Sequence, residues 1–264
     1  MGRIVVWDAC APLGDAVRET AEVLAGGGVA VFPTDTVYGI AQSVLPNPEG
    51  PRRVFAIKHR DPAKTVAWLV GSGEDLERYG SDVPPYALRL AEEFWPGGLT
   101  LVVKATEEVP HAFRAADGTI ALRMPDAPFA LALCRAASSP LATTSANTSG
   151  LKSPSSFAEV EARIIEEADI AVDGGPTLRG QASTVVLCTG EHPHVIREGC
   201  ISSERIWDVL WSSVRACNGD GGLATVGGRP FLCVNRGLKS KVDARGKPAY
   251  STPSRRAPGG GGGP

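Results

Sequence analysis

The sequence has no long hydrophobic segment. No run approaches the roughly 18 consecutive apolar residues of a membrane-spanning helix. The first ten residues, MGRIVVWDAC, contain neither the charged and then apolar stretch nor the small-residue cleavage site of a secretory signal. We therefore expect a cytoplasmic protein with no membrane segment.

Several catalytic and metal-binding patterns are also missing. The six cysteines form no C-x-x-C pair, which excludes a zinc knuckle or a dithiol redox motif and favours reduced thiols. Neither a G-x-x-x-x-G-K-[ST] loop nor a G-x-S-x-G elbow occurs, so covalent catalysis is not indicated. His111, His192 and His194 have no ligand at helical spacing, which predicts surface positions and no fixed metal site.

What is present is enough apolar material for a sizeable core and an uneven charge. The chain has 264 residues, of which 43% are hydrophobic. Residues 1–211 carry 18 Lys and Arg against 27 Asp and Glu, whereas residues 212–264 carry nine against two. An acidic body argues against a broad nucleic-acid surface, which needs cations spread over a whole face.

Apolar runs alternate with helical patterns over residues 1–211, which predicts one α/β domain with a twisted mixed β-sheet flanked by helices and a concave basic pocket. Val17, Ala21 and Leu24 share a helical face that ends at three glycines, and 157–167 is a second amphipathic segment. The predicted strands are 4–7, 29–33, 66–70, 99–104, 119–124, 141–145, 170–173, 183–188 and 194–198.

Residues 212–264 are rich in glycine, proline and basic residues and have few large apolar side chains. Their composition predicts a disordered tail, with one short strand candidate at 229–235.

Three segments carry candidate chemistry. PTDTVYG (33–39) leaves a buried strand and offers hydroxyls and a carboxylate, although such a turn can also satisfy its own backbone. RRVFAIKHRDPAK (52–64) crowds six basic residues together; they could gather at a helix C-terminus, where the dipole favours cations, or grip a polyphosphate. LATTSANTSG (141–150) is a strand that opens into hydroxyls, either a plain loop or a phosphate cradle of backbone donors and hydroxyls.

Two arginines lie within apolar strands, Arg123 in ALRMP and Arg197 in VIREG. A charge in such a place is costly unless it meets a partner, so we expect each to bind a ligand or form an ion pair. Ser183 in GQASTVV is a further polar candidate.

Taken in order, PTDTVYG, KHR followed by Lys64, WPGG-LT (95–100), ALRMP, TTSANTSG, STVV and IREG resemble the YrdC-type threonylcarbamoyl-AMP synthase family. The likeness covers residues 10 to 210. Each motif is weak alone, and it is their shared order and spacing that make the resemblance specific.

The resemblance implies an L-threonylcarbamoyladenylate synthase, a nucleotidyltransferase. Its substrates would be ATP with Mg²⁺, L-threonine and bicarbonate, and pyrophosphate would be released. The product would pass to a tRNA threonylcarbamoyl-transferase complex that modifies adenosine beside the anticodon, with a weak contact to tRNA and no fixed metal in the protein.

Roles follow for the matching positions. The catalytic residues implied are Lys58, Arg60, Ser145 and Asn147. The ATP-binding residues implied are Lys58, Arg60, Lys64, Thr119, Ser145, Ser153 and Arg197. The threonine-binding residues implied are Thr36, Arg123, Thr143 and Ser183.

Three positions depart from the family pattern. Asp61 follows Arg60 in place of a common proline, Gly98 replaces the second proline of WPGP, and Leu69 stands where a polar residue is frequent. Asp61 would either weaken a phosphate grip or point to solvent.

Three other functions are disfavoured by the sequence. An RNA-binding module is disfavoured by the acidic body, and a carbamoyl-adenylate domain serving another acceptor is disfavoured because the extra domains of such chains are missing. A degenerate homologue is disfavoured because the basic and hydroxyl residues are retained.

Overall fold

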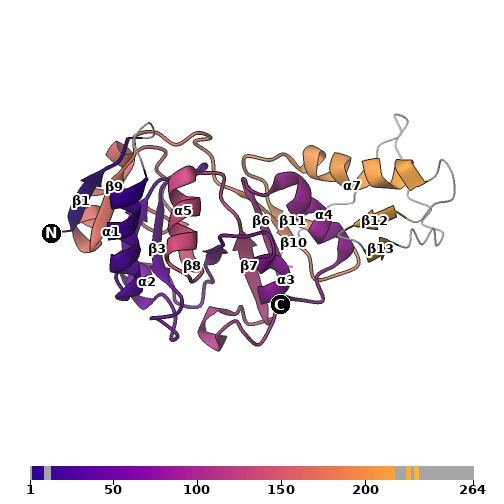
Figure 1. Cartoon of the computed structure of the whole chain (residues 1–264), viewed down its shortest axis with the longest axis horizontal. Helices are drawn as coiled ribbons and strands as arrows, with labels where there is room; N and C mark the ends of the chain where they lie inside the picture. The colour runs from indigo at the N-terminus through magenta and orange to yellow at the C-terminus, as the bar shows by residue number, and fades with distance from the viewer. Residues whose placement is uncertain (1, 9–12, 218–223, 227–228, 232–264) are drawn as a thin grey trace, which may run out of the picture. The chain divides into compact units, whose positions relative to one another are not determined.

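A mixed β-sheet of eleven strands forms the centre of the fold (Figure 1). The computed structural model describes residues 2–8, 13–217, 224–226 and 229–231. The strands of the sheet are β1 (Arg3–Val6), β2 (Ala30–Phe32), β3 (Gly39–Ser43), β4 (Ala67–Leu69), β5 (Gly80–Ser81), β6 (Leu99–Ala105), β7 (Thr119–Arg123), β8 (Leu141–Ser145), β9 (Ile170–Asp173), β10 (Thr184–Leu187) and β11 (His194–Arg197).

The strand order is β1-β9-β2-β3-β8-β4-β7-β6-β10-β11, with β5 paired to β6. β3 and β8 run antiparallel to their neighbours, whereas β4 with β7 and β6 with β10 are parallel pairs. The mixed sheet flanked by helices confirms the predicted fold class. The order also brings the motifs of residues 33–39 and 141–150 together, because β3 lies directly against β8.

The nine predicted strands are confirmed, seven of them with one or both ends shifted by one residue. β3 was not predicted. Its sequence, GIAQS, has a single β-branched residue and therefore a weak strand propensity. All five of its residues are buried, so tertiary packing determines its conformation.

The helices are α1 (Gly14–Ala25), α2 (Arg52–Ile57), α3 (Asp75–Tyr79), α4 (Pro85–Phe94), α5 (Pro128–Ala136), α6 (Ala162–Glu167) and α7 (Ser203–Cys217), with 3₁₀ turns η1 (His111–Phe113) and η2 (Phe157–Glu159). α1 ends at Ala25 with Gly26 as its C-cap, as the glycine run predicts. The single amphipathic segment predicted over 157–167 is divided into η2 and α6. Among the described residues, no helix is both long and apolar enough to cross a membrane.

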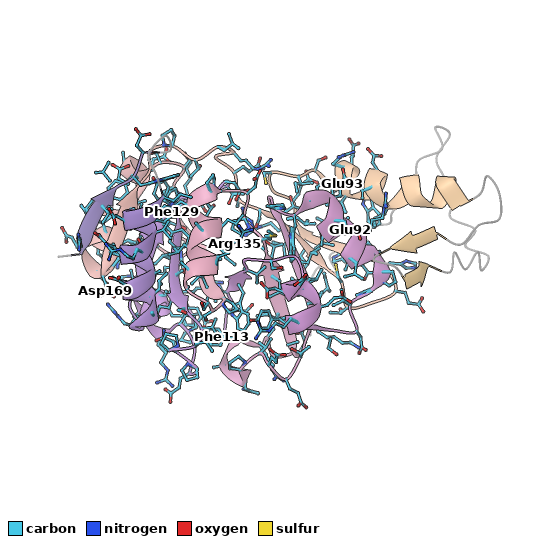
Figure 2. The ribbon with its side chains drawn as sticks, in the orientation of Figure 1. Glu92, Glu93, Phe113, Phe129, Arg135 and Asp169 are labelled. Atoms are coloured by element: carbon cyan, nitrogen blue, oxygen red, sulfur yellow. The ribbon has the colours of Figure 1, made fainter. Side chains whose placement is uncertain are left out.

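Alternate residues of the central strands pack into hydrophobic cores on opposite faces of the sheet. Ala30 and Phe32 pack beneath α1 and α5, which lie side by side in Figure 1, while Val31 packs with α2 and α6. Phe129 of α5, labelled in Figure 2, has its ring centroid 5.2 Å from that of Trp7. Leu69 of β4 belongs to the core that packs against α1 and α5. Leu69 also lines the cavity described below, so the cavity opens on the face of the sheet that these two helices cover in part.

The predicted domain boundary at residues 211 and 212 falls inside α7, which continues to Cys217. Two short strands follow, β12 (Ala224–Val226) and β13 (Arg229–Phe231), which form a separate antiparallel pair. β13 lies within the strand candidate at 229–235. Backbone contacts place the limit of the first unit at residue 231. The prediction of disorder for 212–264 lies mainly outside the described residues.

Candidate active site

A cavity of about 500 Å³ opens over the central strands. Alternate residues of β7 face it: Thr119, Ala121 and Arg123 line the cavity, while Ile120 and Leu122 belong to the core on the other face. Ala121 pairs across the sheet with Val102, which also lines the cavity. The floor is therefore small and apolar, with polar groups on either side of it.

Nine of the predicted site residues line this cavity, and three do not. Those that line it are Thr36, Arg60, Thr119, Arg123, Thr143, Ser145, Ser153, Ser183 and Arg197. Those outside the lining are Lys58, Lys64 and Asn147. Segments separated by more than 140 residues in the chain thus meet at one site.

Arg123 marks one end of the cavity and is almost fully buried. Its Nε donates to the Gly97 carbonyl at 2.9 Å, its Nη1 donates to Thr36 Oγ1 at 2.8 Å, and its Nη2 pairs with the carboxylate of Asp35. Burial lowers the pKa of Arg123, and the Asp35 charge opposes that shift. The prediction that Arg123 meets a charged or ligand partner is confirmed, and the partner is Asp35.

Asp35 also binds a second arginine. Its other oxygen lies 3.4 Å from Nε of Arg179, and its backbone carbonyl accepts the Arg179 N–H at 2.9 Å. The Asp35 side chain has no exposed surface. One carboxylate therefore holds two guanidinium groups and attaches the segment after β9 to the motif at 33–39.

Hydroxyl groups continue from this end along the wall of the cavity. Thr100 Oγ1 and Ser183 Oγ are 2.9 Å apart, and Arg197 Nη2 donates to the Ser183 carbonyl at 2.9 Å. The Thr143 hydroxyl donates to Leu141 within its own strand. This wall combines hydrogen-bonding groups with the cation of Arg197.

Arg60 and Arg197 differ from Arg123 because neither forms an ion pair with an acidic side chain in the part of the chain that the structure describes. Arg60 Nη2 donates to the Thr65 carbonyl at 2.6 Å, and its Nε is buried without a hydrogen-bond partner. Burial lowers the pKa of both guanidinium groups. Three arginines, Arg60, Arg123 and Arg197, line the cavity against one acidic residue, Asp117, and this excess of positive charge favours an anionic ligand.

Tyr38 lines the cavity and connects three other segments of the chain. Its hydroxyl donates to the Gly175 carbonyl at 2.7 Å and accepts the Gly174 N–H at 3.0 Å. Its backbone N–H donates to Pro154, and its carbonyl accepts the N–H of Ala146. Burial raises the pKa of Tyr38 to about 12, so the hydroxyl stays a neutral donor.

Lys58 lies at the C-terminal end of α2, as the helical interpretation of residues 52–64 predicts. Its side chain is buried rather than directed to the cavity. Nζ donates to the carbonyls of Ser145 and Asn147, the latter at 2.5 Å, and lies 3.5 Å from Asn147 Oδ1. Lys64, by contrast, is exposed.

The prediction of a cradle of backbone donors at 145–150 is wrong for residues 146–149. Their amide N–H groups all donate within the protein: Ala146 to Tyr38, Asn147 to Ser145, Thr148 to the Glu161 carboxylate, and Ser149 to Lys58. These amides are not available to a ligand. What this turn offers the cavity is the hydroxyl of Ser145.

Sequence reasoning missed Asp35, Arg179 and Glu161. The carboxylate in PTDTVYG was a visible signal for Asp35. Glu161 accepts both the N–H and the hydroxyl of Thr148, at 2.6 and 2.8 Å. No local pattern indicates Arg179 or Glu161, because each acts on a segment distant in sequence.

The family departures have distinct surroundings. Asp61 is exposed and its carboxylate accepts the Ala63 N–H at 2.9 Å, so it serves a local turn. Leu69 is buried, packs in the core under α1 and α5, and also lines the cavity.

His111, His192 and His194 are exposed, as predicted. In the described segments no group of three His, Cys, Asp or Glu side chains is placed to hold a metal ion.

Gly98 leaves space that Cys200 fills. A Cβ at residue 98 would lie 2.2 Å from Cys200 Sγ. We expect Gly98→Ala to lower the free energy of unfolding by about 1–3 kcal/mol, the usual cost of overpacking. In a Cys200→Ala background the same change should cost less than about 1 kcal/mol, because the clashing atom is gone. Urea unfolding of the four proteins measures this, and equal costs in both backgrounds would contradict it.

Lys58 should give stability a pH dependence. Burial, and after it the charge of Arg60, lowers the pKa of Lys58 from 10.5 to about 8. Between these values the unfolded chain binds more protons, so the free energy of unfolding should rise with pH from about 8 to 10. Lys58→Met should remove the contribution of Lys58 to this increase in the free energy of unfolding. Unfolding by urea at several pH values compares the two proteins, and parallel pH curves would refute the shift.

Comparison with known proteins identifies the family. The Sua5/YciO/YrdC family model, described as telomere recombination, matches residues 22–199. Threonylcarbamoyl-AMP synthase of Pyrococcus abyssi is 35% identical over 194 residues, which are 74% of this chain and 57% of that protein. A putative threonylcarbamoyl-AMP synthase of Mycobacterium tuberculosis is 36% identical over 70% of this chain and 84% of its own length.

Solved structures give the same result. The crystal structure of P. abyssi Sua5 complexed with L-threonine has a TM-score of 0.74 at 31% identity, covering 87% of this chain and 67% of that one. E. coli YciO has a TM-score of 0.71 at 26% identity, covering 78% and 100%. The chain spans little more than half the length of the curated P. abyssi and Bacillus subtilis relatives. The extent of these matches, together with the cavity built from the shared motifs, shows that the chain belongs to the Sua5/YciO/YrdC family.

Proposed function

We propose that this protein is an L-threonylcarbamoyladenylate synthase that converts L-threonine, bicarbonate and ATP into threonylcarbamoyl-AMP and pyrophosphate. One observation carries the proposal: a single cavity has two unpaired cations, Arg60 and Arg197, and a separate polar end built on Arg123. Relatives with the name threonylcarbamoyl-AMP synthase, at 31–36% identity, support the same assignment.

The unpaired cations suit a triphosphate. Arg60 and Arg197 line the same cavity, and the hydroxyls of Ser145 and Ser153 line it with them. Thr119 also lines it, although its hydroxyl donates to Asp117 at 2.7 Å. Guanidinium groups bind phosphate through paired N–H donors. We assign ATP, with the Mg²⁺ that accompanies it in solution, to this region, and Lys64 to its exposed edge.

The Arg123 end suits an amino acid. Arg123 lines the cavity, and its bonds to Gly97, Thr36 and Asp35 use three of its five N–H groups, so two remain for a ligand carboxylate. Asp35 and Asp126 balance the charges of Arg123 and Arg179, so this match rests on hydrogen-bond donors. The hydroxyls of Thr36, Thr143 and Ser183 lie in the same cavity and can meet the amine and hydroxyl of threonine. With this assignment, the amine of threonine would lie between the carboxylate bound at Arg123 and the phosphates.

The chemistry follows from that placement. The threonine amine attacks the carbon of bicarbonate, and loss of water leaves a carbamate. A carbamate oxygen then attacks the α-phosphorus of ATP in line, and the bond to the β-phosphate breaks to release pyrophosphate. The protein forms no covalent bond in this scheme. Positioning of the two substrates and neutralisation of phosphate charge supply the rate enhancement.

The product is a mixed anhydride of a carbamate and a phosphate, which readily gives its threonylcarbamoyl group to an amine. We propose that a tRNA threonylcarbamoyl-transferase complex receives it for the adenosine beside the anticodon, with only a weak contact between this protein and tRNA. A cytoplasmic location follows from these partners.

The test is synthesis by the purified full chain with ATP, Mg²⁺, L-threonine and ¹⁴C-bicarbonate. We expect one labelled adenylate and one pyrophosphate per turnover, both absent when threonine is omitted. Alanine in place of threonine is the control for the hydroxyl contacts. Pyrophosphate release that ignores threonine, or no product with any amino acid, would reject the proposal.

A further inference from the structure

The ammonium group of Lys58 donates its hydrogen bonds inside the protein, to the turn that contains Ser145 and Asn147. We propose that Lys58 is a positioning residue that fixes the Ser145–Asn147 turn, and that it does not itself bind the nucleotide. The inference rests on the proposed function, since it concerns how that function's nucleotide site is built.

Lys58 is only 1% exposed and does not line the cavity, although Arg60, two residues later, does. An ammonium group has three hydrogens to donate. Three oxygens surround Nζ: the carbonyls of Ser145 and Asn147, and Asn147 Oδ1. No donor remains for a phosphate.

The backbone of Lys58 holds the same turn. Its carbonyl accepts the Ser149 N–H at 2.9 Å, so the residue contacts the turn at both its side chain and its main chain. Both carbonyls bound by Nζ are consequently directed away from the cavity. The Ser145 side chain lines the cavity, and no hydrogen bond inside the described part of the protein occupies its hydroxyl.

Other contacts fix the remainder of the turn, and none replaces Lys58. Asn147 Nδ2 donates to the carbonyls of Thr148 and Leu151, and Glu161 binds Thr148. The Ser145 carbonyl also accepts the Asn147 N–H at 3.0 Å, whereas among the described residues Lys58 Nζ is the one donor to the Asn147 carbonyl. Without the ammonium, the Ser145 carbonyl loses one of its two donors and the Asn147 carbonyl loses its donor. A buried carbonyl without a donor is unfavourable enough to move a turn.

The role can be tested because a residue that acts through Ser145 loses its effect when Ser145 is changed. Affinity for a non-hydrolysable ATP analogue is measured by calorimetry on the full chain without threonine. We expect Lys58→Met to weaken binding at least tenfold in the natural sequence and less than twofold in a Ser145→Ala background. Arg197→Met, as the direct-contact control, should weaken binding by similar factors in both backgrounds.

Equal factors for Lys58→Met in both backgrounds would overturn the inference, because they would mean that Lys58 contacts the nucleotide independently of Ser145. Amide hydrogen exchange gives a second readout: residues 146–149 should exchange faster in Lys58→Met and unchanged in Arg197→Met. Unchanged exchange in Lys58→Met would also overturn it. If the natural sequence binds no analogue, the proposed function fails instead.

If Lys58→Met does not fold, Asn147→Ala provides the same test with the ammonium retained. It removes one acceptor of Lys58 and two donors inside the turn. We expect it to weaken nucleotide binding in the natural sequence but less than twofold in the Ser145→Ala background. Full affinity in Asn147→Ala would count against the turn as the element that Lys58 acts on.

Discussion

Arg123→Met is expected to abolish threonine-dependent pyrophosphate release and to lower the free energy of unfolding by about 3–5 kcal/mol, the cost of leaving one partner of a buried ion pair. Asp35 has no exposed surface, and its remaining partner, Arg179 at 3.4 Å, is partly exposed. The variant also removes the hydrogen bond to Thr36. Urea unfolding and the pyrophosphate assay measure the two effects separately.

A double variant separates stability from function. Asp35→Leu with Arg123→Met replaces the pair by apolar side chains and should recover much of the lost stability, because well-packed apolar groups often match a buried ion pair. Activity should not return, since the carboxylate site is still missing. Arg78→Met, which breaks the exposed pair with Glu108, should cost less than about 1 kcal/mol. Threonine-dependent activity in the double variant would contradict the assigned role of Arg123.

The second large effect is expected at Arg60. Arg60→Met should lower kcat/KM for ATP by roughly ten- to 150-fold, which corresponds to losing a charged hydrogen bond of about 1.5–3 kcal/mol. The guanidinium lines the cavity, forms no ion pair among the described residues, and has a buried Nε without a partner. Stability should change little, because the variant breaks one hydrogen bond to the Thr65 carbonyl.

Two controls make the Arg60 result specific. Arg60→Lys keeps the charge but loses the paired donors, so it should recover only part of the ATP dependence. Arg78→Met removes an exposed arginine of α3 and should leave kcat/KM unchanged. If Arg60→Met acts on KM for threonine and not for ATP, the assignment of the two ends of the cavity is reversed.

The sequence by itself was sufficient for the local properties of the site. The runs at 119–124 and 141–145 predict strands, and residues of both strands line one cavity: Thr119 and Arg123 of β7, and Thr143, Thr144 and Ser145 of β8. The basic residues after 52 were predicted at a helix C-terminus, and α2 ends there. Such features depend on neighbours a few residues away, which a sequence displays directly.

The tertiary structure alone decided which polar groups meet. Lys58 and Arg60 are two residues apart, yet one is buried against a turn 87 residues later and the other lines the cavity. Asp35 and Arg123, 88 residues apart, pair because β3, β8, β4 and β7 lie side by side in the sheet. Strand order and register are collective results of packing the whole core, so no local pattern contains them. The sequence therefore determined which chemical groups this protein has, and the fold determined which of them remain free for a ligand.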